Sequence, residues 1–165
     1  MDPIETVALV GAGTMGSGVA QKAAQEGFKV QLIDRDQESI ERGMSMINST
    51  LQEAVERKIM TSEKVQNVLE NLTPIIDTNN VDIATDIVIE AVFEEMNIKK
   101  EVFKKIDDLA KDGAILASNT STLDIDEIAS VTKRPGDVVG THFFSPANVM
   151  RLLEIIRGIE TKIDV

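Results

Sequence analysis

The stretch VALVGAGTMGSGVAQKAAQEGFKVQLID, residues 7–34, decides the fold of this chain. Its apolar run at 7–10 leads into the glycine spacing G-x-G-x-x-G, a helical pattern follows over 14–26, and a second apolar run ends in Asp34. This order predicts a strand, a glycine turn, a helix and a second strand. Glycines at such a turn can simply relieve steric conflict, but the complete context indicates a dinucleotide site.

Each residue of the glycine loop has an expected role. Gly11 permits the tight turn, Gly13 lets the backbone approach a pyrophosphate, and Gly16 allows helix and strand to pack closely. The diphosphate is expected over the helix N-terminus, where free amides and the helix dipole favour negative charge. Thr14 and Met15 lie at that N-terminus and complete the predicted cofactor-binding loop.

The acid that closes the stretch indicates which dinucleotide binds. Asp34 is placed to accept hydrogen bonds from the adenosine ribose, and its charge would repel a 2′-phosphate. The sequence therefore predicts NAD as the cofactor. Arg35 leaves NADP open as an alternative, because a neighbouring guanidinium could receive such a phosphate.

The rest of the chain repeats the alternation of apolar runs and helical patterns. Apolar runs that predict strands buried on both faces occur at 7–10, 30–33, 86–92, 114–118, 137–144 and 152–156. Helical patterns occupy 14–26, 36 to about 59, 62–71, 97–110 and 124–130. The predicted fold class is α/β, a Rossmann-like doubly wound and mostly parallel sheet with right-handed crossovers.

The segment 36–72 is too long for one ordinary crossover. Apolar residues at spacings of three and four fill its first half, and a second helix restarts near a possible cap at Thr61 or Ser62. We expect a helical hairpin inserted over about 36–72. The four prolines lie at predicted element edges, so residues 1–165 are expected to form one NAD-binding domain.

Composition excludes several classes of protein. The 165 residues with 42% apolar content suffice for one core, and a net charge of -11 argues against nucleic acid as a partner. No apolar run is long enough to span a membrane, and the N-terminus lacks a secretory signal, so we expect a cytoplasmic protein. With no cysteine and one histidine, disulfides and thiol catalysis are excluded and no metal site is expected.

The single histidine is the first candidate for chemistry. His142 lies in VVGTHFFSP, and Glu154 follows 12 residues later in a second apolar run. If both runs are strands, the two side chains could meet, and a carboxylate would then fix the tautomer of the imidazole and raise its basicity. The alternative is a hydrogen-bonded core histidine and an unrelated surface glutamate.

The second candidate is the loop ASNTSTLDIDEIA, residues 117–129, which leaves a strand and enters a helix. Its hydroxyl groups could act as donors beside a reacting oxygen at the carboxyl end of the sheet. They could equally serve as turn and cap residues, with Asp124 and Glu127 forming a capping-box pattern. Both interpretations stay open at this point.

These segments together resemble one known family. VGAGTMGSGVAQ, VIEAVFEEMNIKKEVFKKID, ILASNTSTL and GTHFFSPANVMRLLEII are similar to the 3-hydroxyacyl-CoA dehydrogenases of fatty-acid β-oxidation and butyrate pathways. The resemblance covers nearly the whole chain. It implies oxidation of L-3-hydroxyacyl-CoA to 3-ketoacyl-CoA with NAD, in a reversible reaction, with an acyl-CoA as partner.

The resemblance also implies roles for individual residues. His142 matches the catalytic base, Glu154 the acid that orients it, and Ser121 the residue that hydrogen-bonds the reacting oxygen. The matching cofactor positions beyond the glycine loop and Asp34 are Glu94, Lys99, Asn119 and Ser145. Thr50 and Arg57, seven apart on the expected hairpin, match positions used against CoA, although Arg57 could also be ordinary surface charge.

Two departures from the family pattern are visible. Ser145 stands where many members have asparagine, although multifunctional relatives also carry serine. The family also continues into a C-terminal helical domain, which is absent from a chain that stops at Val165. We therefore expect the cofactor half of an enzyme, with the substrate half open to water and association either as a homodimer or with a helical C-terminal domain.

Two other functions compete with this interpretation. One is a non-catalytic dinucleotide-binding module of the same family. The other is a β-hydroxyacid dehydrogenase of the hydroxyisobutyrate or phosphogluconate type, which also has a G-x-G-x-M-G loop but lacks the THFF…E pair. Turnover would exclude the non-catalytic module. A preference for CoA thioesters over free acids would exclude the β-hydroxyacid dehydrogenase.

Overall fold

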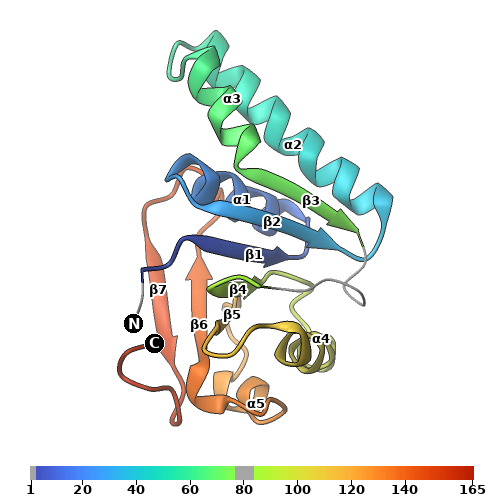
Figure 1. The fold of residues 1–165 in the computed structure, drawn as a ribbon, viewed down its shortest axis with the longest axis vertical. Helices are drawn as coiled ribbons and strands as arrows, with labels where there is room; N and C mark the ends of the chain where they lie inside the picture. Colours follow the sequence, from blue (N-terminus) through green and yellow to red (C-terminus); the bar gives the residue numbers. More distant parts are fainter. Residues whose placement is uncertain (1–2, 77–83) are drawn as a thin grey trace.

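A seven-stranded sheet forms the centre of the computed structural model, which describes residues 3–76 and 84–165 (Figure 1). The strand order is β3-β2-β1-β4-β5-β6-β7. The strands are β1 (Thr6–Val10), β2 (Lys29–Asp34), β3 (Leu72–Ile76), β4 (Ile87–Glu90), β5 (Ile115–Ser118), β6 (Val138–Phe143) and β7 (Leu153–Arg157). β1 to β6 are parallel and β7 is antiparallel to β6, which confirms the predicted Rossmann-like, mostly parallel sheet.

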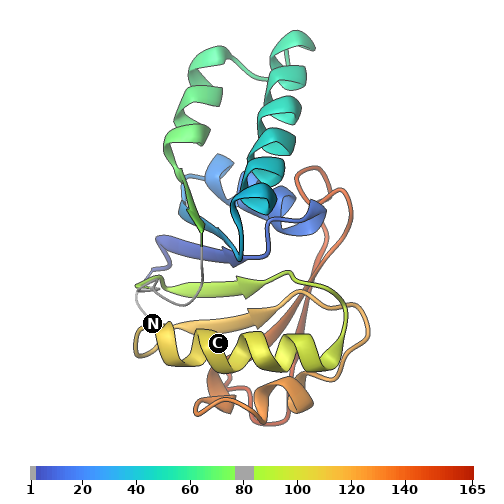
Figure 2. The same ribbon diagram turned by 90° about the vertical axis from the view of Figure 1, so that its right-hand side faces the viewer.

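Helices cover both faces of the sheet (Figure 2). They are α1 (Thr14–Gln25), α2 (Gln37–Glu56), α3 (Ser62–Glu70), α4 (Met96–Leu109) and α5 (Ile125–Ala129), with a short 3₁₀ turn at Pro135–Asp137. Apolar residues of α1, α2 and α3 pack on one face, and those of α4 and α5 pack on the other. Along β1, Val7 and Leu9 join the first core whereas Ala8 and Val10 join the second, as the alternation of a strand requires.

The chain reverses its winding direction between β1 and β4. β1 pairs with β2 on one side and with β4 on the other, and Val10 lies opposite Glu90 at the carboxyl ends. In open α/β sheets a ligand binds in the crevice outside the strand ends at such a reversal. The topology therefore places the candidate site above β1 and β4.

The helical hairpin has the expected position. Asp36 caps α2 by accepting from the Ser39 N–H, and Thr61 caps α3 by accepting from the Lys64 N–H. Both helices extend well beyond the sheet (Figure 1). The hairpin ends at Glu70, slightly earlier than expected, because the chain then forms a strand.

That strand, β3, corrects the sequence prediction. Pro74 lies inside β3 and not at an element edge, and it pairs with Leu32 of β2. Proline lacks an N–H group and weakens the signal for a strand, but an edge strand tolerates it because only one side carries ladder hydrogen bonds. The strand expected at 86–92 is also shorter and ends at Glu90.

The last strand corrects a second expectation. All five residues of β7 are exposed, so the run at 152–156 is not buried on both faces. An apolar run looks the same in sequence whether its strand is central or at an edge. β7 is the antiparallel edge strand, and its pairing with β6 brings Glu154 opposite His142.

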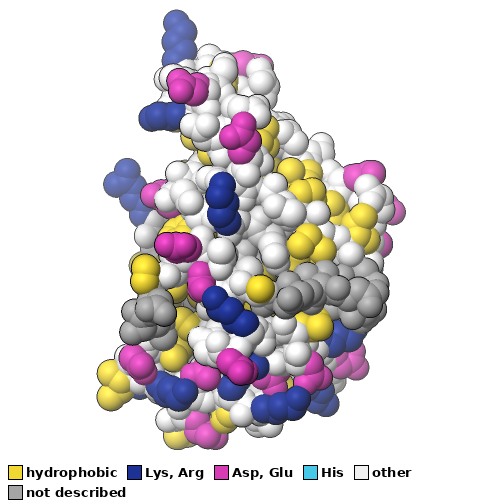
Figure 3. Space-filling view, viewed as in Figure 1, with side chains coloured by type: hydrophobic (Ala, Val, Ile, Leu, Met, Phe, Trp, Pro, Cys, Tyr) yellow, Lys and Arg dark blue, Asp and Glu magenta, His cyan; other side chains and the backbone are white. Residues whose placement is uncertain are grey.

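The visible surface carries charges of both signs. On the face seen in Figure 3, lysine and arginine side chains alternate with aspartate and glutamate and form no broad basic area. Within residues 3–76 and 84–165, no helix combines the length and apolar character that crossing a membrane requires.

Candidate active site

At the glycine loop, β1, α1 and the segment that follows β4 pack closely against one another. Gly11 has a φ of +107°, and its N–H donates to the Ile33 carbonyl at 2.8 Å. A Cβ at Gly11 would lie 2.8 Å from the Ala91 carbonyl oxygen, and one at Gly16 would lie 1.8 Å from the Gly11 oxygen. Neither position has room for a side chain, so both glycines serve close backbone packing.

Gly13 differs from the other two because a Cβ there would meet nothing within 4 Å. Gly13 also precedes α1 as its N-cap, and no side chain among the described residues caps this helix. The first-turn amides are therefore free to face an anion, with the helix dipole adding to the attraction. Open space at Gly13 leaves room for a phosphate to approach the backbone.

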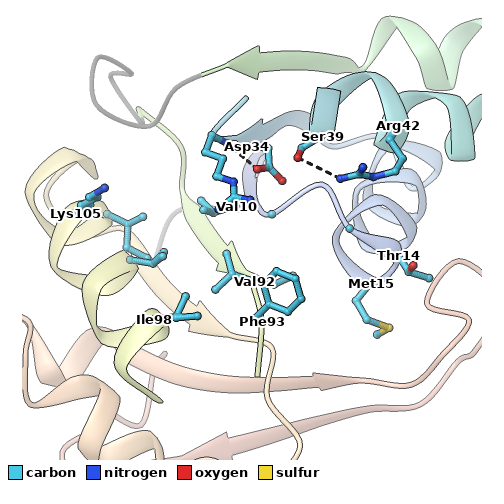
Figure 4. A pocket seen from close by; sticks show the side chains of 16 residues that line it. Val10, Thr14, Met15, Asp34, Ser39, Arg42, Val92, Phe93, Ile98 and Lys105 are labelled. Atoms are coloured by element: carbon cyan, nitrogen blue, oxygen red, sulfur yellow. Dashed lines mark hydrogen bonds between the residues drawn. The ribbon is translucent and has the colours of Figure 1, made fainter. Parts of the chain in front are cut away.

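A cavity of about 560 Å³ lies beside this loop (Figure 4). Thr14 and Met15 line it from α1, and Phe93 and Ile98 line it from the segment after β4 and from α4. Phe93 is largely exposed at 78%, which leaves its ring available to a ligand. The cavity combines an apolar wall with a helix N-terminus, as a site for a dinucleotide requires.

Asp34 lines the same cavity and holds the glycine loop in place. One carboxylate oxygen accepts from the Ala12 N–H and the other accepts from the Arg35 N–H, each at 2.7 Å. A carboxylate offers about four acceptor positions, so two remain for ribose hydroxyls. Arg35 also lines the cavity, while its guanidinium pairs with Asp36 at 3.2 Å.

The cavity fits the NAD that the sequence predicts. The free helix N-terminus, the open backbone at Gly13 and the remaining acceptor positions on Asp34 match the diphosphate and the adenosine ribose. Arg42 contacts the Ser39 hydroxyl at 3.3 Å on the wall near Asp34 (Figure 4). The chain therefore supplies groups for the diphosphate and for the adenosine ribose.

A second cavity of about 390 Å³ adjoins the first through Met15, Ala91 and Val92. The predicted site residues that line it come from four separate parts of the chain: Met15, Glu94, Asn119, Ser121, His142 and Ser145. Fold topology thus gathers the candidate reactive groups at the carboxyl end of the sheet.

His142 lies between two partners. Its Nδ1 is 2.8 Å from a carboxylate oxygen of Glu154, and its Nε2 is 3.1 Å from the Ser121 hydroxyl. A carboxylate only accepts, so Nδ1 carries the hydrogen and Nε2 of the neutral ring keeps its lone pair. The Ser121 hydroxyl donates to that lone pair, and a substrate hydroxyl at the same place could give its proton to Nε2.

Glu94 binds the Ser121 loop. Its Oε1 accepts from the Thr120 hydroxyl and from the Ser121 N–H, the latter at 2.9 Å. Partial burial acts to raise the pKa of Glu94, but these hydrogen bonds and the charge of Lys99 outweigh burial and lower it. Glu94 is therefore a carboxylate at neutral pH, which lets it both hold the loop and face the cavity.

Lys99 is buried against Glu90. Its side chain is 0% exposed, and its ammonium donates to Glu90 at 2.7 Å and to the Asn119 carbonyl at 3.1 Å. Lys99 lines neither of the two cavities described above, so its contact with the cofactor stays a prediction. Glu94 lies 3.5 Å from the ammonium.

Asn119 and Ser145 both line the second cavity. The Asn119 side-chain oxygen also accepts from the Phe143 N–H at 3.1 Å, which ties the loop to β6 beside His142. For Ser145 the structure gives a place on the cavity wall, and its contact with the cofactor stays a prediction.

The hairpin residues lie apart from both cavities. The Thr50 hydroxyl donates to the Met46 carbonyl at 2.9 Å within α2. Arg57 directly follows α2 and pairs with Glu53, with 66% of its side chain exposed. Neither residue lines the two cavities described above, so their role against CoA stays a prediction.

Glu90 is the residue of this region that sequence reasoning missed. It ends β4, its side chain is 0% exposed, and one of its oxygens accepts from the Ser118 hydroxyl at 2.7 Å. Burial raises the pKa of Glu90, while Lys99, Ser118 and the Val92 N–H oppose the rise. An acid that closes an otherwise apolar strand, IVIE, was the available signal.

The chain is similar to known proteins along nearly its full length. Residues 6–165 match the family model described as 3-hydroxyacyl-CoA dehydrogenase, NAD binding domain. A probable 3-hydroxybutyryl-CoA dehydrogenase of Bacillus subtilis is 43% identical over 98% of this chain and 58% of its own length. A 3-hydroxybutyryl-CoA dehydrogenase of Clostridioides difficile is 44% identical over 92% of this chain and 54% of its own length.

Solved structures give the same result. The crystal structure of (S)-3-hydroxybutyryl-CoA dehydrogenase from Ralstonia eutropha matches with a TM-score of 0.94 and 36% identity, covering 98% of this chain and 57% of that chain. The present chain thus spans somewhat more than half the length of these relatives. It belongs to the 3-hydroxyacyl-CoA dehydrogenase family and carries the NAD-binding domain of that family.

Proposed function

We propose that this chain provides the cofactor site and the acid–base residues for reversible oxidation of an L-3-hydroxyacyl-CoA to a 3-ketoacyl-CoA. The observation that carries the proposal is the line from Ser121 through His142 to Glu154 beside the dinucleotide cavity. The relatives named 3-hydroxybutyryl-CoA dehydrogenase support the choice of substrate class.

Bound NAD would supply a hydride acceptor for oxidation, and NADH a hydride donor for the reverse reaction. His142 starts the oxidation as a neutral base and takes the proton of the substrate 3-hydroxyl on Nε2. Glu154 keeps the ring oriented and stabilises the imidazolium that forms. Ser121 donates to the reacting oxygen and fixes its distance from Nε2.

The proposal also covers the contact of the helical hairpin with CoA and the metabolic pathway. Thr50 and Arg57 are proposed to contact the CoA part of the substrate, since both lie on the segment that extends beyond the sheet. Relatives named as the alpha subunit of a fatty acid oxidation complex support a place in β-oxidation, and butyrate metabolism is the related alternative. A cytoplasmic location stays a prediction from the sequence.

The competing functions differ in what they leave unexplained. A non-catalytic module would have no use for a histidine held between a serine and a carboxylate next to the cofactor cavity. A β-hydroxyacid dehydrogenase that acts on free acids would likewise leave the contacts of His142 with Ser121 and Glu154 unexplained. Comparing turnover of acetoacetyl-CoA with turnover of acetoacetate distinguishes such an enzyme from the proposed one.

The first experiment measures NADH oxidation with acetoacetyl-CoA and, on the same sample, NADH binding. We expect His142→Gln to reduce turnover about 10²- to 10⁴-fold, the usual contribution of a positioned general base, while NADH binding is retained. Binding without turnover in the unaltered chain would place a further requirement in the part of the relatives that this chain does not cover. Failure to bind NADH, or equal turnover by His142→Gln, would contradict the proposal.

A further inference from the structure

A buried ion pair lies directly beneath the candidate catalytic loop. Glu90 and Lys99 are each 0% exposed, and one carboxylate oxygen of Glu90 is 2.7 Å from the Lys99 ammonium. The same oxygen accepts from the Val92 N–H, and the other accepts from the Ser118 hydroxyl, each at 2.7 Å. The pair therefore joins the end of β4, the first turns of α4 and the end of β5.

The ammonium of Lys99 extends this connection to the reacting groups. It donates to the Asn119 carbonyl at 3.1 Å, and the side-chain oxygen of Asn119 in turn accepts from Phe143, the neighbour of His142. It also lies 3.5 Å from Glu94, whose other oxygen accepts from the Ser121 N–H. The buried ammonium of Lys99 is thus linked through Asn119 to the neighbour of His142, and through Glu94 to Ser121.

Stability alone does not explain such a pair. Removing two charges from water costs several kcal/mol, and apolar residues of similar volume often replace a buried ion pair without loss. Glu90 accepts three hydrogen bonds and Lys99 donates two, and these bonds join the two residues to each other, to the loop and to the ends of β4 and β5. The geometry therefore favours a role in placing that loop.

We propose that Glu90 and Lys99 are positioning residues, which act through Asn119 and Glu94 to hold the Ser121 hydroxyl at its distance from Nε2 of His142. The inference rests on the proposed function, because it assigns the pair to the same proton-transfer site. Neither residue touches the reacting atoms.

A test is available because His142 is the one histidine of the 165 residues. Nitrogen NMR of the imidazole in this chain then reports the surroundings of Nε2 without need for turnover. Ser121→Ala removes the hydroxyl and defines the shift expected when the contact is lost. Glu127→Gln is the matched control, because Glu127 pairs with Lys100, the neighbour of Lys99 on α4, at the surface.

Two substitutions then separate positioning from a simple change of charge. Glu90→Gln removes a negative charge and Lys99→Met removes a positive one, so a field effect would move the Nε2 resonance in opposite directions. Loss of positioning instead moves it in the same direction for both variants, toward the value in Ser121→Ala. We expect the second result, with the resonance of Glu127→Gln unchanged.

The outcomes distinguish this inference from the function on which it rests. Opposite shifts, or wild-type resonances in folded Glu90→Gln and Lys99→Met, would overturn the positioning role alone. A wild-type resonance in Ser121→Ala would instead remove the Ser121 contact from the proposed mechanism, and the positioning role with it. If a single variant does not fold, the double variant Glu90→Gln/Lys99→Met replaces it, because it leaves no buried charge without its partner. The two field effects oppose each other in the double variant, so a shift toward the value in Ser121→Ala supports positioning and a wild-type resonance overturns it.

Discussion

Gly13→Ala should separate cofactor binding from folding. The backbone at Gly13 has a φ of -72° and a ψ of -172°, which alanine adopts freely, and the added methyl group would meet no atom within 4 Å. Alanine restricts the unfolded chain, which stabilises by about 0.4–1 kcal/mol. It is a poorer N-cap than glycine, which costs about 0.5–1 kcal/mol. The two effects nearly cancel, so the free energy of unfolding should be almost unchanged.

The same methyl group points into the space where the diphosphate is expected. Blocking one charge-assisted hydrogen bond from the loop should cost about 1.5–3 kcal/mol of binding free energy. This corresponds to a roughly 10- to 150-fold rise in the Kd for NADH. A titration followed by NADH fluorescence measures the Kd, and thermal unfolding followed by circular dichroism measures stability.

Gly16→Ala provides the contrast. Its Cβ would lie 1.8 Å from the Gly11 carbonyl oxygen, so α1 would have to move away from the loop. Forced overpacking of this kind should cost about 3 kcal/mol or more. If Gly13→Ala binds NADH as the wild type does, or loses as much stability as Gly16→Ala, the placement of the diphosphate at Gly13 is wrong.

Three further results are expected. Glu154→Gln keeps a hydrogen bond to His142 but loses the charge that stabilises the imidazolium, so turnover should fall while the Kd for NADH stays near its wild-type value. The hydrogen bonds that Asp86 accepts, led by the one from the Lys111 ammonium, hold its pKa well below the ordinary value. Its contribution to stability is therefore complete above about pH 4 and shrinks as the pH falls, and urea unfolding should show the gap between wild type and Asp86→Asn narrowing in acid. Arg134→Ala should lower the free energy of unfolding by about 3–5 kcal/mol, because it leaves the buried Asp107 carboxylate without its cation; unchanged stability in denaturant would contradict this.

The first half of the fold follows from local patterns. The apolar run, the three glycines and Asp34 predict β1, α1 and β2 because each element shows its own period and its own end signal. The hairpin is equally visible, since Asp36 and Thr61 cap its helices as local chemistry requires. These interactions involve residues close in sequence, so the sequence shows them directly.

Local patterns were least informative for the edge strands. β3, which contains a proline, was missed, and β7 was predicted as a strand but as one buried on both faces, whereas it is exposed along its length. Whether such a run becomes a central strand, an edge strand or a loop depends on which strands lie beside it. That is a property of the assembled sheet.

The candidate site divides in the same way. From the sequence come the predicted nucleotide loop, an acid expected at the ribose and, through family resemblance, the predicted roles of His142, Glu154 and Ser121. The burial of Lys99 against Glu90 is visible only in the folded chain. Burial and long-range pairing depend on side chains that are far apart in the chain, and a charged residue looks the same in sequence whether water or a carboxylate surrounds it.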